Sequence, residues 1–333
     1  RLEASRRVRS SEASGASHAS KRPARMFVRT LVLLHLVFER AAGLSGELGS
    51  IVQRKLSEAR ELNQQHGNAG ESDVARRLSF GASRGNWRFS EAIRREVDAD
   101  GARRISIMPD IKRRSPHGAR GGAAQDIAGF SDAAKVARAM RQWDVDALCV
   151  NTDSAYGGKV EELLSVRQEF AKDATKPPVL MKDFIVDPIQ IALAAELGAD
   201  AVVLIAAVLG ARLTDLLDMA TVLGIEAAVE VHTPDECTFA LSQGATLLLV
   251  NSRDRATGQL HKGQAAGLRH LIPPNIVSVA CGGISTLQDV QIHADAGYDG
   301  VMLGRALVGG DPEEARKLVA KTRALRLMPN MWG

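Results

Sequence analysis

From about residue 100 onward, short apolar runs alternate with longer segments in which apolar and polar positions have helical spacing. Eight runs are predicted as strands: residues 105–109, 147–151, 179–182, 201–207, 227–231, 247–251, 276–280 and 300–303. Helices are predicted between them, for example over residues 188–197, 213–223, 234–243 and 287–296. Continuous apolar runs are typical of parallel strands buried on both faces. Eight such units in roughly 230 residues favour an α/β fold closed into a (β/α)8 barrel, also called a TIM barrel.

The chain before the barrel has two parts of different character. Residues 1–46 are predicted as a leader-like, disordered or docking arm, since the first 25 are rich in Arg, Ser and Ala and an apolar stretch follows over 27–38. An organellar transit peptide fits this composition, while a secretory-type segment and an amphipathic helix that docks on a partner are the alternatives. Residues 47–100 are predicted as a helical extension, with helices over 50–66 and 89–97 and a connector over 67–87. Residues 101–333 form the predicted barrel.

Charge and cysteine content exclude several classes of protein. The net charge of +4 is concentrated in residues 1–30, which carry an excess of six positive charges, so the remainder is near neutral at −2. A nucleic-acid-binding protein should carry a basic patch on its folded part, so no nucleic-acid partner is expected. Three widely spaced cysteines show no metal-ligand spacing, so neither a metal nor a cofactor is expected.

Polar side chains follow most of the predicted strands, at the end of a barrel where active sites form. Asp110 and Lys112 lie two apart, so they share one face of their strand. Lys182, Glu230 and Asn251 end later strands and should converge with them in an acid/base site. Glycines at the ends of the last two strands would let backbone N–H groups approach a phosphate.

Single charges at strand ends are usually solvated surface groups, but their coincidence at five strand ends favours a site. Asp183 is interpreted as a cap for the segment that follows it. His232 is interpreted as structural, pointing away from Glu230.

Four segments carry a resemblance to a known family. They are Pro-Asp-Ile-Lys-Arg-Arg-Ser-Pro over 109–116, Pro-Val-Leu-Met-Lys-Asp-Phe-Ile-Val-Asp-Pro over 178–188, Glu-Val-His over 230–232 and Val-Asn-Ser-Arg-Asp over 250–254. In order and spacing they resemble indole-3-glycerol-phosphate synthase. The similarity runs from about residue 51 to about 319 and includes the helical segment before the barrel.

The resemblance implies a carbon–carbon lyase of tryptophan biosynthesis. Its phosphorylated substrate, a carboxyphenylamino-deoxyribulose phosphate, would close to an indole with loss of CO2 and water. By similarity, Lys182 would be the general acid, Glu230 the base in dehydration, and Lys112 the contact to the substrate carboxylate. Asp110 and Asn251 would orient these groups.

The resemblance also implies a phosphate site. Arg253, Gly283 and Gly304 would bind the phosphate, with the loop at Ser115 closing over it. Two neighbours, Gly282 and Arg305, belong to the same group.

This sequence departs from the family pattern at the site itself. Asp110 stands where the family has Glu, and Cys281-Gly282-Gly283 stands where Glu-Ser-Gly is usual. Arg305 stands in place of a small or acidic residue, where it would add a phosphate contact or plug the pocket. The loop over 151–158 is shorter than the family's, with Tyr156 where an aromatic residue is expected.

The departures leave two principal hypotheses. One is a working synthase in an organelle, above all a plastid, with the cytoplasm as the alternative. The other is a catalytically impaired barrel, a pseudoenzyme recruited as an accessory subunit, whose N-terminal arm docks on a protein complex or a membrane surface. A different phosphosugar enzyme on the same barrel is a third interpretation.

Overall fold

The protein is described here from a computed structural model, which describes residues 46–66, 72–83, 85, 87–94, 102–115, 124–254 and 258–327. The arm predicted over residues 1–46 lies outside these residues except for its last position.

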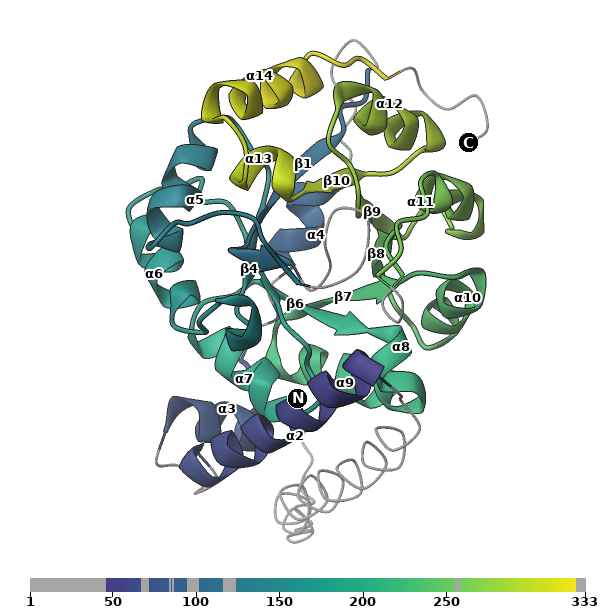
Figure 1. Ribbon diagram of the computed structural model, residues 1–333. Coiled ribbons are helices and arrows are strands. Elements are labelled where there is room, and N and C mark those ends of the chain that lie inside the picture. Colours follow the sequence, from purple (N-terminus) through teal and green to yellow (C-terminus); the bar gives the residue numbers. More distant parts are fainter. Residues whose placement is uncertain are drawn as a thin grey trace, which may run out of the picture.

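Eight parallel strands close into a barrel, in the order β1-β10-β9-β8-β7-β6-β5-β4 (Figure 1). They are β1 (Ser106–Ile111), β4 (Leu148–Asn151), β5 (Val179–Lys182), β6 (Ala201–Ile205), β7 (Glu226–Val231), β8 (Leu247–Asn251), β9 (Val277–Cys281) and β10 (Gly300–Leu303). The barrel predicted from the alternating pattern is confirmed, and most strand ends agree to within one residue. The strand predicted over 201–207 ends two residues early, at Ile205, because Ala206 begins a short helix.

Helices form a ring around the strands in Figure 1. The longer ones are α5 (Ala133–Arg141), α6 (Glu162–Glu169), α7 (Pro188–Glu196), α9 (Leu213–Leu223), α10 (Pro234–Ser242), α11 (Gln264–Leu268), α12 (Leu287–Ala296) and α14 (Pro312–Arg323). Short elements complete the loops: η1 (Ser154–Tyr156), α8 (Ala206–Leu209), η2 (Gly210–Arg212), η3 (Arg269–Leu271), α13 (Arg305–Val308), and β2 (Arg114–Ser115) paired with β3 (Gln125–Asp126).

Local sequence explains where several helices begin. Asp187, Thr233 and Asp311 each accept a backbone N–H of the following helix, and a proline stands in each first turn. These caps fix where the chain leaves each strand, and therefore which residues stand at the mouth of the barrel.

Three helices precede the barrel: α2 (Gly46–His66), α3 (Asp73–Phe80) and α4 (Arg88–Ile93). The prediction of a connector over 67–87 is wrong where α3 forms. The two turns of α3 are too short to show a clear helical period, and Ser72 acts as its N-cap. The helix predicted over 89–97 is α4, which ends at Ile93 with non-helical backbone at Arg94, so the prediction runs too far. Buried Phe89 and Ile93 place α4 against β1 and β9.

In the described part of the chain, no helix is both long and apolar enough to cross a membrane.

Candidate active site

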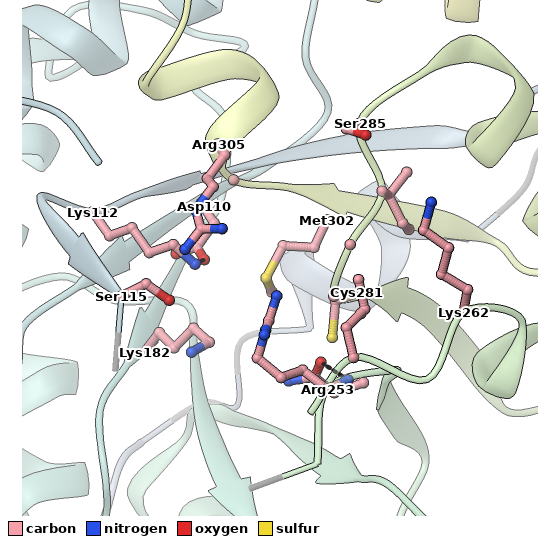
Figure 2. A pocket seen from close by; sticks show the side chains of 16 residues that line it. Asp110, Lys112, Ser115, Lys182, Arg253, Lys262, Cys281, Ser285, Met302 and Arg305 are labelled. Atoms are coloured by element: carbon pink, nitrogen blue, oxygen red, sulfur yellow. Dashed lines mark hydrogen bonds and ion pairs between the residues drawn. The ribbon is translucent and has the colours of Figure 1, made fainter. Parts of the chain in front are cut away.

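A cavity of about 280 Å³ opens at the C-terminal ends of the strands (Figure 2). Ten of the eleven predicted site residues line it, and Glu230 does not. The ten are Asp110, Lys112, Ser115, Lys182, Asn251, Arg253, Gly282, Gly283, Gly304 and Arg305. The residues that the sequence analysis missed include Lys262 and Ser285, which lie in loops beyond the strand ends.

Asp110 and Lys112 form an ion pair at one side of the cavity, as their shared face predicts, with 2.5 Å between Nζ and Oδ2. Burial alone would raise the pKa of Asp110, but the positive charges of Lys112 and Lys182 outweigh it and hold that pKa below its usual value. The thiol of Cys149 donates to the same carboxylate at 3.7 Å, and burial raises its own pKa well above the usual value. The carboxylate is therefore ionised and the thiol is protonated at neutral pH.

Lys182 ends β5 and lies opposite Asn151 in the sheet. Its side chain lines the main cavity and also a smaller one of about 20 Å³, whose walls include the rings of Tyr156 and Phe184. The lysine thus lies between the main cavity and a small space that has two aromatic residues in its wall.

Glu230 lies sealed beneath the cavity, with 0% of its surface exposed. Asn251 donates from Nδ2 to its Oε1 at 3.3 Å, and Asn251 Oδ1 accepts the backbone N–H of Arg253 at 3.0 Å. The expected convergence therefore holds for Lys182 and Asn251, while Glu230 contacts Asn251 but does not line the cavity.

The interpretation of His232 as pointing away from Glu230 is wrong. Its Nε2 lies 3.1 Å from Glu230 Oε1, because residues two apart on a strand share a face.

The end of the cavity where the sequence predicts a phosphate site has two consecutive glycines with left-handed backbone. Gly282 and Gly283 have φ of 86° and 76°. A Cβ at residue 282 would lie 2.3 Å from Asn251 Oδ1, and one at 283 would lie 2.7 Å from Leu260. A serine at residue 282 would therefore collide with the Asn251 side chain. Glycine at this position allows Asn251 to keep the conformation seen in this chain.

Two arginine side chains line the same cavity as these glycines. Arg253 donates from Nη1 to the carbonyl of Gly258 at 2.7 Å. Arg305 follows Gly304 at the end of β10 and lines the cavity without closing it, and burial lowers its pKa. Figure 2 shows Arg305 on the side of Lys112 and Asp110, and Lys262 on the opposite side.

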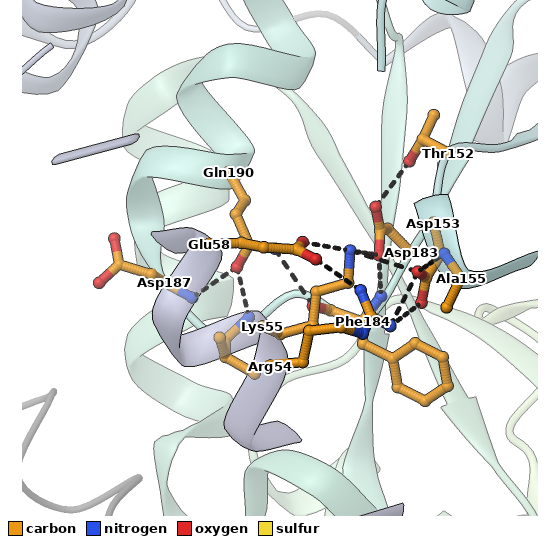
Figure 3. Close-up of polar contacts among 11 residues, drawn as sticks. Arg54, Lys55, Glu58, Thr152, Asp153, Ala155, Asp183, Phe184, Asp187 and Gln190 are labelled. Carbon is orange, nitrogen blue, oxygen red and sulfur yellow. Dashed lines mark hydrogen bonds and ion pairs between the residues drawn. The ribbon is translucent and has the colours of Figure 1, made fainter. Parts of the chain in front are cut away.

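Asp183 does more than the predicted cap. It accepts the N–H of Phe184 and the hydroxyl of Thr152, and its carboxylate lies 2.7 Å from Nζ of Lys55, a buried residue of α2 (Figure 3). Burial alone would lower the pKa of Lys55, but Asp183 and Asp153 outweigh it and raise that pKa. An ion pair therefore joins the helical extension to Asp183, the residue next to Lys182. No local sequence pattern indicates this contact, because the two segments are far apart in the chain.

The described residues contain no group of three or more His, Cys, Asp or Glu side chains that could hold a metal ion.

The fold and site define a (β/α)8 barrel with an acid/base and anion-binding mouth. The sequence model of the family "Indole-3-glycerol phosphate synthase" matches residues 48–319. The chain belongs to the indole-3-glycerol phosphate synthase family.

Two bacterial relatives carry that name. The protein of Parafrankia sp. (strain EAN1pec) is 38% identical over 216 residues, which cover 64% of this chain and 76% of the relative. That of Chlorobium phaeovibrioides (strain DSM 265 / 1930) is 32% identical over 261 residues, or 78% and 93% of the two chains. A solved 3-hexulose-6-phosphate synthase matches with a TM-score of 0.50 at 12% identity over 66% of this chain and 99% of that one, which shows the shared fold alone.

The comparisons give no support to the alternative of an accessory subunit. Transit peptide and plastid location stay predictions.

Proposed function

We propose that this protein is an indole-3-glycerol phosphate synthase, a lyase that closes the indole ring of a carboxyphenylamino-deoxyribulose phosphate with loss of CO2 and water. The observation that carries the proposal is one cavity in which Lys182, the Asp110–Lys112 pair and Asn251 stand together. This combination offers a proton donor, a cation for the substrate carboxylate and an amide that contacts a buried base.

The walls of the two cavities match a substrate with an aromatic end and a phosphate end. Tyr156 and Phe184 line the smaller cavity beside Lys182 and would contact the edge of a carboxyphenyl ring bound in the main cavity. Arg253 and Arg305 would bind the phosphate with backbone N–H groups of Gly283 and neighbouring residues. The ketone between these ends would then lie near Lys182.

In the proposed reaction the side chains act one after another, in ring closure, decarboxylation and dehydration. Lys182 protonates the ketone oxygen as the ring carbon attacks and the new C–C bond forms. Lys112 holds the carboxylate until the C–C bond to it breaks and CO2 leaves, and the released electron pair restores the aromatic ring. In dehydration, Glu230 removes a proton from the intermediate once Asn251 turns from it toward the substrate. Lys182 takes up a proton from solvent after ring closure and gives it to the departing hydroxyl, which leaves as water; solvent then restores the charged form of Lys182.

Complementation tests the proposal in a cell. A tryptophan auxotroph that lacks its own synthase should grow without tryptophan when it expresses this chain. Lys182→Met should abolish growth, because it removes the proton donor while keeping a similar side-chain length. Lys317→Met, a change at an exposed lysine of α14, is the matched control and should support growth. Absence of growth with the wild-type chain, when folded protein is present, would refute the proposal.

A further inference from the structure

The sealed carboxylate of Glu230 has a second partner that faces away from the cavity. His232 Nε2 lies 3.1 Å from Glu230 Oε1, and His232 Nδ1 lies 3.0 Å from Oε2 of Glu236 on α10. The imidazole is 2% exposed, whereas the side chain of Glu236 is 23% exposed. One buried ring therefore joins the carboxylate beneath the active site to a carboxylate that water reaches.

The neighbours of the two carboxylates favour their ionised form. Glu230 Oε1 also accepts from the amide of Asn251, and Glu236 Oε2 also accepts the backbone N–H of His232 at 2.8 Å. Each oxygen that faces the ring thus accepts another donor, as an ionised carboxylate does. With both carboxylates ionised, both ring contacts are hydrogen bonds only if each ring nitrogen donates, which requires the imidazolium form.

The elements around the ring favour that charge. β7 contributes Glu230, α10 contributes Glu236 and β8 contributes Asn251, while Gln264 of α11 donates to the backbone carbonyl of His232. The charged side chains that contact the ring in these hydrogen bonds are both acidic. An imidazolium between two carboxylates is stabilised from both sides.

We propose that His232, held as an imidazolium by Glu236, is a positioning residue that keeps the sealed Glu230 carboxylate ionised and ready to accept a proton. The inference rests on the proposed function, in which Glu230 is the base. A carboxylate removed from water takes up a proton unless a charge or hydrogen bonds compensate for its lost solvation. Glu230 protonated in this way could not remove a proton from the intermediate.

His232 neither gains nor loses a proton during dehydration. The intermediate gives one proton to Glu230, and the electron pair left behind forms the ring double bond. The hydroxyl departs as water with a proton from Lys182. His232 keeps both ring protons throughout, and Glu230 and Lys182 return to their resting states by proton exchange after the product leaves.

The pH dependence of kcat tests this role. In His232→Gln, an amide still donates to Glu230 but carries no charge. The acidic limb of the kcat profile should therefore move to higher pH by about 1–3 units, the range set by one nearby opposite charge. At the pH where the wild-type enzyme is half-maximal, kcat should fall at least about fivefold, which follows from a shift of one unit or more. It should recover in alkaline buffer, with KM within about threefold.

Two further variants separate charge from structure. Glu236→Gln should move the same limb in the same direction by a smaller amount, because it leaves His232 in place without its stabilising charge. Glu313→Gln makes the same change in the first turn of α14 and should leave the profile unchanged. An acidic limb that stays at its wild-type pH in His232→Gln, or a loss of kcat that no pH restores, would overturn the proposal.

A measurement that needs no turnover separates this inference from the proposed function. Nitrogen-15 NMR of the wild-type protein at pH 7 should show both ring nitrogens of His232 protonated, with the signals assigned by their loss in His232→Gln. In Glu236→Gln the ring should lose a proton at lower pH than in the wild type. A neutral ring in the wild type at pH 7 overturns the inference even if the enzyme is active. An inactive wild type with a charged ring refutes only the proposed function. If His232→Gln does not fold, Glu236→Gln and the ring's pH titration carry the test.

Discussion

Restoring the serine that the family usually has at residue 282 should damage this protein. Gly282 has φ of 86°, and a Cβ there would lie 2.3 Å from Oδ1 of Asn251. That distance is far inside van der Waals contact, so the amide of Asn251 must move. Its bonds to Glu230 and to the N–H of Arg253 would then weaken or break.

Two contributions set the expected loss of stability. Left-handed backbone at a non-glycine residue costs about 1–2 kcal/mol. Displacing the buried amide of Asn251 adds about 1–3 kcal/mol, since its partners lose hydrogen bonds. Gly282→Ser should therefore lower the free energy of unfolding by about 2–5 kcal/mol.

Gly244→Ser is the matched control. Gly244 has φ of 88°, but a Cβ there meets nothing within 4 Å. It should show the backbone contribution of about 1–2 kcal/mol alone. Urea unfolding measures both variants, and kcat should fall in Gly282→Ser but not in Gly244→Ser. Equal losses of stability with unchanged kcat would refute the reasoning about Asn251.

Three further predictions follow from charge at and around the cavity. Lys55→Met should lower the free energy of unfolding by about 3–5 kcal/mol in urea titrations, because buried Asp183 loses its partner; a loss no larger than that of the surface variant Lys317→Met would contradict this. Asp110→Asn should be less stable than the wild type by a constant amount from about pH 5 to 8. Because the pKa of Asp110 is held below the usual 3.8, that difference should shrink as pH falls below this value, which acid unfolding followed by circular dichroism measures, and a difference independent of pH would count against it. Arg305→Ser should raise both KM and the inhibition constant of inorganic phosphate about tenfold with kcat within twofold, since one charge-assisted contact is lost; an unchanged phosphate constant would remove Arg305 from the phosphate site.

The barrel and most of the cavity wall could be predicted from sequence because both depend on local pattern. Continuous apolar runs indicate buried parallel strands. Closure of the barrel brings the polar residues at the strand ends together, independently of the loop conformations. Lys182 and Asn251 lie at strand ends and therefore face the cavity, as expected. The Asp110–Lys112 pair needed only the two-residue period of a strand.

The rest depends on contacts that no local pattern records. Strand-end position does not show that Glu230 is sealed, because the depth of a side chain depends on what covers it, here Asn251. The pairing of Lys55 with Asp183 joins segments far apart in the sequence. The orientation of His232 could have been predicted. The two-residue period of a strand places it beside Glu230, as it places Lys112 beside Asp110.

Indole formation by the purified protein tests the central claim most directly. With carboxyphenylamino-deoxyribulose phosphate as substrate, the wild-type chain should release equal amounts of CO2 and indole-3-glycerol phosphate. Lys182→Met should lower kcat by about 100- to 10,000-fold, the usual effect of losing a general acid, and Lys317→Met should match the wild type. A folded wild-type protein that neither turns over nor binds this substrate would contradict the account, as would full activity in Lys182→Met.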